Sequence, residues 1–401
     1  MKRRILTDHT LIIDELEKSI KFHNWNFILG FLPKGSYLVG GYIRDIILGR
    51  KTEKVDVDIV VPLNAIEIGK KISDNIESKF IILDKKREVV RIILKHISID
   101  IANQVSSTIK GDLSARDFSI NSVAFLFDKK CLFDPLNGLK DLELFFLRTH
   151  SEINMLNDPL RILRCFRFIS ELNFKLDPKL ISFIKNNKGK LFLVAKERIY
   201  YEIQKIVNGA NAIEAMILIK KLNIFGSDDL YEDPFFLDLR KINYEDLHQE
   251  EKEKFLPLFF ITQILDVLSL EKLKFSKAEI VKTKILRKWQ FFLNNKNIAQ
   301  LNEIDRFKLH QELEAFLPCF IFYLPKNVRL DWLKRWRDKE DKLFHPSNLL
   351  NGDEIKKNIE IEDGPTLGKL LQYLSMELAY KRLNNFDEAI YKAKQWIEQN
   401  A

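Results

Sequence analysis

The hydrophobic pattern of this 401-residue chain changes once, near residue 150. Before that point, short runs rich in β-branched residues are separated by helical patterns near 41–49 and 64–77. The predicted strands are Tyr37–Val39, Val55–Val61, Phe80–Leu83, Val89–Leu94, Ser98–Ala102 and Val123–Phe127. After that point, almost every segment has helical spacing. The pattern predicts an α+β fold, with a mixed-sheet head followed by an elongated all-α part.

Breaks in the periodicity predict five consecutive regions. An amphipathic helix with Leu11, Leu16 and Ile20 at helical spacing opens the chain. The later helical pattern is interrupted at Gly209 and Pro325, among other positions. We expect an N-terminal helical extension over 1–30, a head over 31–150, a neck over 151–210, a body over 211–330 and a tail over 331–401.

The charge balance favours an acidic polymer as partner. Lys and Arg number 65 against 57 Asp and Glu, which gives a formal net charge of +8. Nucleic acid is the first expectation for such a surplus, although many basic proteins bind none. Three cysteines, Cys131, Cys165 and Cys319, lie far apart, and their number and spacing argue against a disulfide framework or a zinc site. No secretory signal or membrane span is readable, so we expect a cytoplasmic protein.

A glycine pair follows the first predicted strand. Gly40 and Gly41 stand at a strand-to-helix turn, where the lack of side chains lets a phosphate approach the backbone. Arg44, one helical turn later, is placed to pair with a phosphate oxygen. The alternative is an ordinary tight turn followed by solvated charges.

Two aspartates alternate with apolar residues in the second predicted strand. Asp56 and Asp58 are two positions apart, so both project from the same face of the strand. Carboxylates held together repel unless a cation lies between them, and magnesium prefers such oxygen ligands. An exposed strand face is the alternative, but aspartate is a poor strand former. Asp100, in a later strand, is a candidate third acid, as a metal ligand or as a base, or else a lone edge-strand acid.

A third set of polar residues occurs in Ala115–Ala124. Arg116, Asp117 and Asn121 are spaced to lie on one side of a turn and helix, where they would hydrogen-bond ribose hydroxyls or phosphates. A helix-capping role explains Asp117 equally well.

These segments, in this order, resemble the head of the class II tRNA nucleotidyltransferases and poly(A) polymerases. That family's pattern is G-G-x-V-R-D-x-L-L-G, then D-x-D, then R-R-D-F-T-x-N-A, and the run from Asp134 to Leu142 resembles its closing D-P-x-x-G-x-x-D-L. The resemblance implies that Asp56 and Asp58 hold magnesium. It also implies that Gly40, Gly41 and Arg44 contact the triphosphate, while Arg116, Asp117 and Asn121 contact the sugar. One departure is Ala115, where the family usually has arginine.

The start of the predicted neck resembles the family's E-D-x-x-R motif, in which the protein itself acts as the template. Asp158 would accept from the amino group of cytosine or adenine, and Arg161 would donate to the ring nitrogen. Uracil and guanine present a carbonyl where that amino group should be, so they would be rejected. Arg164 and Arg167 continue the same basic stripe and are further candidates for nucleotide binding. The alternative is that Asn157 or Asp158 merely caps a helix in which Pro159 takes an early position.

The resemblance implies addition of nucleotides from CTP and ATP to the 3′ end of tRNA. Only fifteen residues separate Asp100 from Arg116, and this short connection is similar to that of the CC-adding branch. The alternatives are full CCA addition, poly(A) synthesis on other RNA, and a catalytically silent RNA-binding relative. Basic stretches over 272–288 and 326–337 suit contact with RNA phosphates, or else are solvated helix faces.

Overall fold

We describe the protein from a computed structural model, which covers residues 5–50, 54–226, 236–294, 298–359 and 361–400. The chain forms two compact units. Residues 1–202 and 209–218 belong to the first unit, and residues 203–208 and 219–401 belong to the second. No helix of the described ranges is long and apolar enough to cross a membrane.

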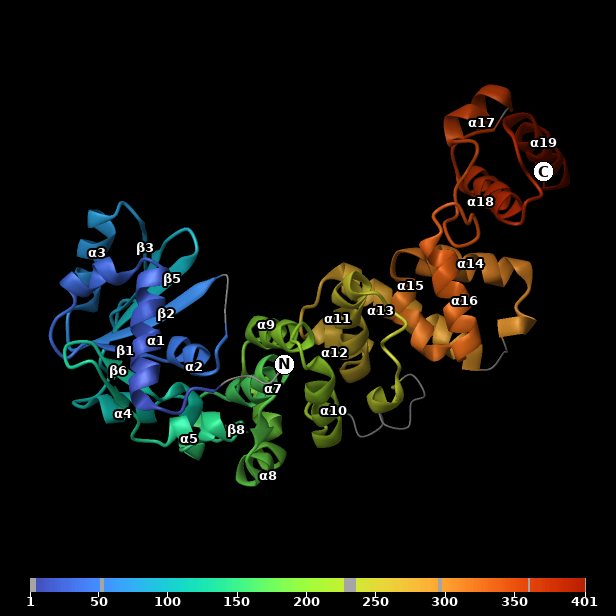
Figure 1. Cartoon of the computed structure of the whole chain (residues 1–401). Coiled ribbons are helices and arrows are strands. Elements are labelled where there is room, and N and C mark those ends of the chain that lie inside the picture. The colour runs from blue at the N-terminus through green and yellow to red at the C-terminus, as the bar shows by residue number, and fades with distance from the viewer. Residues whose placement is uncertain (1–4, 51–53, 227–235, 295–297, 360, 401) are drawn as a thin grey trace. The chain divides into compact units, whose positions relative to one another are not determined.

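The first unit contains a seven-stranded mixed sheet, shown in blue and green in Figure 1. Its strands are β1 (Tyr37–Val39), β2 (Val55–Val61), β3 (Lys79–Asp84), β4 (Val89–Ile93), β5 (Ile97–Asn103), β6 (Ala124–Leu126) and β7 (Cys131–Phe133). Their order in the sheet is β3-β4-β5-β2-β1-β6-β7. The pair β2 and β5 is parallel, and the other neighbours are antiparallel. The sheet contains all six predicted strands, and β7 is an addition that its short, exposed sequence did not indicate.

Helices surround this sheet and continue beyond it within the first unit. They are α1 (His9–Phe22), α2 (Gly41–Ile47), α3 (Ala65–Asn75), α4 (Ile109–Ser114), α5 (Gly138–Glu143), α6 (Glu152–Asn157), α7 (Arg161–Leu172), α8 (Pro178–Asn187), α9 (Lys196–Val207) and α10 (Ala212–Leu222), the last two of which run on into the second unit. Two short strands, β8 (Phe146–Leu147) and β9 (Lys175–Leu176), pair in parallel. The mixed sheet followed by helices confirms the predicted α+β class.

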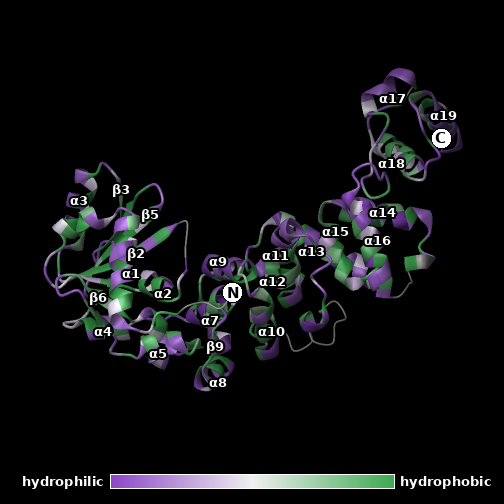
Figure 2. Cartoon of the chain, in the orientation of Figure 1, coloured by the Kyte–Doolittle hydropathy of each residue, from purple (hydrophilic) through white to green (hydrophobic). Residues whose placement is uncertain are grey.

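Hydrophobic spacing explains how these elements assemble. In α1, Ile12, Leu16 and Ile20 recur every four residues and are buried, while Figure 2 shows hydrophilic and hydrophobic colours alternating along the helix. In α3, Gly69 lies so close to β4 that an added Cβ would meet Val90 Cγ2 at 2.6 Å. Helix α3 therefore covers the face of the sheet that carries Val90 and leaves the opposite face to other residues.

The second unit is helical. Its helices are α11 (Gln249–Ile264), α12 (Val267–Lys272), α13 (Lys277–Asn294), α14 (Glu303–Leu313), α15 (Leu317–Phe320), α16 (Lys326–Arg337), α17 (Gly352–Asn358), α18 (Pro365–Ala379) and α19 (Phe386–Asn400). The last three enclose a small apolar core of their own, which includes Ile355, Leu370 and Ala389. This agrees with the predicted change to helical structure after the head.

Candidate active site

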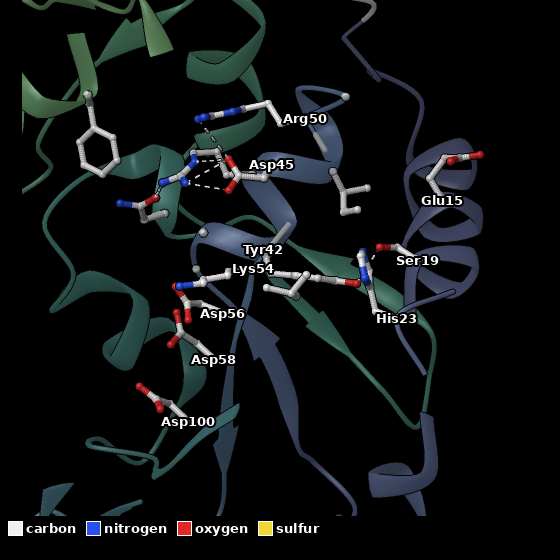
Figure 3. Close-up of a pocket in the computed structure, with 18 of the residues that line it drawn as sticks. Glu15, Ser19, His23, Tyr42, Asp45, Arg50, Lys54, Asp56, Asp58 and Asp100 are labelled. Carbon is white, nitrogen blue, oxygen red and sulfur yellow. Dashed lines mark hydrogen bonds and ion pairs between the residues drawn. The ribbon is translucent and has the colours of Figure 1, made fainter. Parts of the chain in front are cut away.

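The strand register places acidic side chains in a row across the sheet. Asp58 of β2 is paired with Asp100 of β5, and Asp100 is paired in turn with Arg91 of β4. Residues directly paired across strands point to the same face, so all three project together. Asp56 lies two positions from Asp58 on this face and accepts a hydrogen bond of 2.6 Å from Ser98 Oγ. Figure 3 shows Asp56, Asp58 and Asp100 close to one another.

The surroundings of Asp58 disfavour its charged form. Burial raises the pKa of Asp58 above its ordinary value, and the nearby Asp100 and Asp56 carboxylates add to this, against the opposing effect of Arg116. Asp100 is held differently, because Arg91 donates to both of its oxygens at 2.7 Å. A cation next to Asp56 and Asp58 would relieve the repulsion between them.

The glycine turn lies directly beside these carboxylates. Gly40 has φ +82°, a conformation that L side chains rarely adopt. An added Cβ would lie 2.6 Å from Asp58 Oδ2 and 3.0 Å from Arg116 Nη1. Glycine is therefore required twice, for the backbone conformation and for the close approach of Asp58 and Arg116. Arg116 Nε is buried without a hydrogen-bond partner, so the turn has a donor available for an oxyanion.

Hydrogen bonds join the glycine turn to the start of the neck. Arg44 Nη1 donates to Asn121 Oδ1 at 2.8 Å, and Asn121 Nδ2 donates to Asp117 Oδ1 at 3.0 Å. The other Asp117 oxygen accepts from Arg164 Nε at 2.7 Å. Burial alone would raise the pKa of Asp117, but Arg164 and the hydrogen bonds from Asn121 and Phe118 outweigh it and hold the pKa below its ordinary value. Asp117 thus links α2, the 3₁₀ turn Ser119–Asn121 and α7, and it caps no helix.

Three guanidinium groups surround one buried ring on α7. Arg44, Arg164 and Arg167 lie 5.2, 5.7 and 4.9 Å from the centre of the Phe168 ring. Arg167 also donates to Glu202 at 3.0 Å. The ring and its partners fix the arginines at the edge of the site.

A single cavity of about 820 Å³ contains most of the predicted site residues. It is lined by eleven of them: Gly40, Gly41, Arg44, Asp56, Asp58, Asp100, Arg116, Asp117, Asn121, Arg164 and Arg167. A cavity of this size accommodates a nucleotide-sized ligand.

Two predicted residues lie outside the lining of this cavity. The Asp158 carboxylate accepts from Arg198 Nη2 at 2.9 Å, and Arg161 Nη2 donates to the Ala115 carbonyl at 3.2 Å. Arg161 Nη1 is buried without a partner. The alternative that Asp158 caps the helix after Pro159 is wrong, because Asp158 ends α6 and its side chain pairs with Arg198 instead.

Sequence reasoning missed several residues that line the same cavity. Arg91 is the most informative, and its signal was a lone charge between the buried Val90 and Ile92 of an apolar strand. Lys54 lies two positions before Asp56, so it shares the face of the carboxylates. Figure 3 shows Ser19 of α1 and His23, which directly follows α1, near the Tyr42 side chain, and Ser19 Oγ lies 2.7 Å from Tyr42 Oη. Only the tertiary structure brings α1 to this cavity.

The basic stretches of the second unit are partly consumed by internal ion pairs. On α16, Arg329 is buried against Asp246 at 2.7 Å, and Arg337 pairs with Glu251 at 2.6 Å. On α13, Lys284 and Lys288 pair with Glu271 and Glu312. Both stretches are therefore less available to phosphates than their charge count suggests.

Comparisons with known proteins identify two domain families in the chain. Residues 36–148 match the family model of the poly A polymerase head domain, and residues 173–227 match that of the probable RNA and SrmB-binding site of polymerase A. A CC-adding tRNA nucleotidyltransferase of Synechocystis is 27% identical over 92% of this chain and 95% of the relative. One of Geobacter sulfurreducens is 34% identical over 50% of this chain and 47% of the relative.

Solved structures show the same fold. A CCA-adding enzyme in complex with ATP has a TM-score of 0.74, with 21% identity over 97% of this chain and 98% of that chain. The Thermotoga maritima CCA-adding enzyme in complex with tRNA has a TM-score of 0.70, with 23% identity over 90% and 91%.

The sheet, the glycine turn and the paired carboxylates define a nucleotidyltransferase head. Residues 36–148 belong to the poly A polymerase head-domain family, and the chain as a whole has the fold of the CCA-adding enzymes.

Proposed function

We propose that this protein is a tRNA nucleotidyltransferase that adds C to the tRNA 3′ end from CTP, with further addition of A from ATP as the alternative. The observation that carries the proposal is the position of Asp56 and Asp58 beside the Gly40 turn, in one cavity with Arg44 and Arg116. The name of the Synechocystis relative, which aligns with almost the whole chain, supports the same reaction.

In the proposed reaction, the tRNA 3′-hydroxyl attacks the α-phosphorus of the nucleoside triphosphate. A bond forms between the 3′-oxygen and the α-phosphorus, and the bond to the bridging oxygen breaks to release pyrophosphate. Asp100 takes the hydroxyl proton, and Arg44 and Arg116 offset charge on the triphosphate. Asn121 donates to the sugar, while Asp117 holds Asn121 and Arg164 in place.

The side chains fit magnesium as the cofactor. Within the described ranges, no group of three or more His, Cys, Asp and Glu side chains is arranged to hold a metal alone. Magnesium commonly binds through one or two carboxylates together with substrate phosphates, and Asp56 and Asp58 provide those two. When bound, two magnesium ions supply Lewis-acid stabilisation of the attacking and leaving oxygens.

Base selection is assigned to the neck. Asp158 and Arg161 would form the template for cytosine or adenine, and the unpartnered Arg161 Nη1 is a donor suited to a ring nitrogen. The amino group of the base must then replace Arg198 on the Asp158 carboxylate. Arg167 contributes positive charge next to Arg164 at the edge of the cavity. We assign tRNA binding to the tail over 331–401. We also place the reaction in the cytoplasm.

CC addition is favoured over full CCA addition. The connection between Asp100 and Arg116 has only fifteen residues, and α4 occupies six of them. Little chain is left for a flexible segment that would adapt the cavity from cytosine to adenine. The two relatives described above are both named as CC-adding.

Incubating the protein with tRNA that lacks its CCA end, with each NTP alone and in pairs, tests the proposed reaction. We expect two C residues from CTP and no further A when ATP is added. A terminal A would exclude the CC-only reaction. A long A tract on unrelated RNA would instead identify a poly(A) polymerase.

Replacing Asp58 with Ala separates an enzyme from a silent RNA-binding relative. We expect nucleotide addition to fall by at least 10³-fold, because the metal pair is lost, while tRNA binding stays within about twofold. Asp128→Ala, at an exposed position after β6, serves as the matched control. Retained addition by Asp58→Ala would contradict the assignment of Asp58 to the metal.

A further inference from the structure

The order of the strands gives the site two distinct flanks. Asp58 of β2 has Val39 of β1 on one side and Asp100 of β5 on the other. Strand β1 leads directly into the Gly40 turn, with Arg44 and Arg116 nearby. Strand β5 pairs on its other side with β4, where Arg91 lies opposite Asp100. Oxyanion donors therefore lie on the β1 flank, and the Asp100–Arg91 pair lies on the β4–β5 flank.

Phosphoryl transfer imposes a direction on these flanks. The attacking and leaving oxygens lie roughly in line on opposite sides of the phosphorus. If the triphosphate occupies the β1 flank, its leaving pyrophosphate lies there too. The attacking 3′-hydroxyl must then approach from the β4–β5 flank, where Asp100 is placed to accept its proton.

The β4–β5 flank is accessible on the face that carries Arg91. Helix α3 covers the opposite face, where Gly69 meets Val90. The Arg91 and Asp100 side chains keep 40% and 22% of their surface exposed, and Ile93, two positions along β4, is 37% exposed. This combination of a cation, a carboxylate and an apolar side chain matches the phosphate, hydroxyl and base or sugar of one nucleotide.

The geometry of Arg91 leaves part of its guanidinium available. Nε and Nη2 donate to the two oxygens of Asp100, which fixes the plane of the group. The edge that carries Nη1 points away from Asp100, and Arg91 lines the same cavity as the carboxylates. A fixed guanidinium with a free edge is suited to bind a phosphate.

We propose that the face formed by Arg91, Ile93 and Asp100 binds the 3′-terminal nucleotide of the acceptor RNA, with Arg91 on the phosphate of that nucleotide. The proposal rests on the proposed function and assigns the attacking strand to its own subsite. Arg91 thereby has two roles, since it binds RNA and positions Asp100 next to the hydroxyl.

The test compares Arg91→Met with wild type on two acceptor RNAs. One RNA is unmodified, and the other carries a neutral methylphosphonate in place of the phosphate 5′ to its terminal nucleotide. Arg87→Met is the matched control, because Arg87 lies in the turn between β3 and β4 and its side chain is 78% exposed. The KM for RNA, the KM for CTP and the salt dependence of RNA binding are measured for each protein.

We expect Arg91→Met to raise the KM for unmodified RNA roughly tenfold and to leave the KM for CTP unchanged. The methylphosphonate should raise the KM of wild type for RNA by a similar factor. It should not raise the KM of Arg91→Met any further, because the two changes remove the same contact. For Arg91→Met, the slope of log affinity against log salt concentration should fall in magnitude by about 1, which corresponds to the loss of one phosphate contact. Arg91→Lys should restore the KM for RNA only in part, because lysine keeps the positive charge but lacks the planar guanidinium that binds two oxygens at once.

Equal losses of Arg91→Met on both RNAs would overturn the proposal, as would a rise in its KM for CTP alone. A fall in kcat with no change in the KM for RNA would reduce Arg91 to a positioning residue for Asp100. If wild type adds no nucleotide, the proposed function has failed instead. Fluorescence anisotropy with the same two RNAs then makes the comparison without catalysis, and equal affinities in wild type would overturn the subsite.

Discussion

Asp58, which we propose as a metal ligand, lies where its charge is disfavoured in the folded protein. It lies partly buried next to Asp56 and Asp100, and burial together with these neighbours disfavours its charge. A carboxylate that is stable in the folded protein only with a cation nearby is a ligand prepared in advance. The proposed metal binding and the stability of the metal-free protein therefore make opposite demands on this position.

Replacing Asp58 with Asn should stabilise the metal-free protein and abolish its response to the substrate. We expect the melting temperature in EDTA to rise by on the order of 2–4 °C, because a charge held against burial and repulsion is removed. Magnesium with CTP should raise the melting temperature of wild type but not of the variant. Differential scanning calorimetry measures both. A lower melting temperature of the variant in EDTA would show that, in wild type, the attraction of Asp58 to Arg116 outweighs its repulsion from Asp56 and Asp100.

At the same scale, the sequence indicated the acids better than their partners. Alternation with apolar residues was enough to place Asp56 and Asp58 on one face. The ion pair of Asp100 with Arg91 depends on the order in which β4 and β5 pair, which local spacing does not contain. Likewise, Asp158 has a good local reason to cap a helix, but the long-range contact with Arg198 prevails.

Among the elements, the head and α7 are joined most directly by the ion pair of Asp117 and Arg164. Asp117, just before the 3₁₀ turn, is held by Arg164 of α7, and both side chains line the cavity. The six predicted strands and the helices near 41–49 and 64–77 were predictable to within a few residues, because each element has its own period. The link between them was not, because it joins residues 47 positions apart through buried charges.

Replacing Arg164 with Met should destabilise the protein in a pH-dependent way. We expect a loss of about 2–3 kcal/mol at pH 7, because Asp117 is left buried without its main cation. The folded pKa of Asp117 is below its ordinary value, so its contribution is fully present above that value and is lost as the pH falls through the folded pKa. Denaturant unfolding between pH 3 and pH 7 should show the difference from wild type shrinking below about pH 4. A difference that does not vary with pH would show that Arg164 acts through packing on Phe168 instead.

For the whole molecule, the division into two compact units places the candidate active site in the first unit and the basic stretches over 272–288 and 326–337 in the second. All residues that line the active-site cavity belong to the first unit. In the second unit, Arg329 and Arg337 of α16 are held by Asp246 and Glu251. A count of charges along the sequence gave α16 the same weight as the stretch over 272–288. Both stretches form ion pairs, but the paired Arg329 and Arg337 are only 10% and 29% exposed, whereas the paired lysines of α13 stay about half exposed.

Amide hydrogen exchange should reveal this separation. We expect CTP with magnesium to slow exchange in α2, β2 and β5 and to leave the second unit unchanged, since the proposed nucleotide site lies in the first unit. Adding tRNA should extend the protection to the tail helices α17 to α19, and to α12 and α13, where Lys272 and Lys277 are exposed, more than to α16. Protection of the second unit by CTP alone would show that the units are coupled. Stronger protection of α16 would place the RNA on the residues that we assign to internal ion pairs.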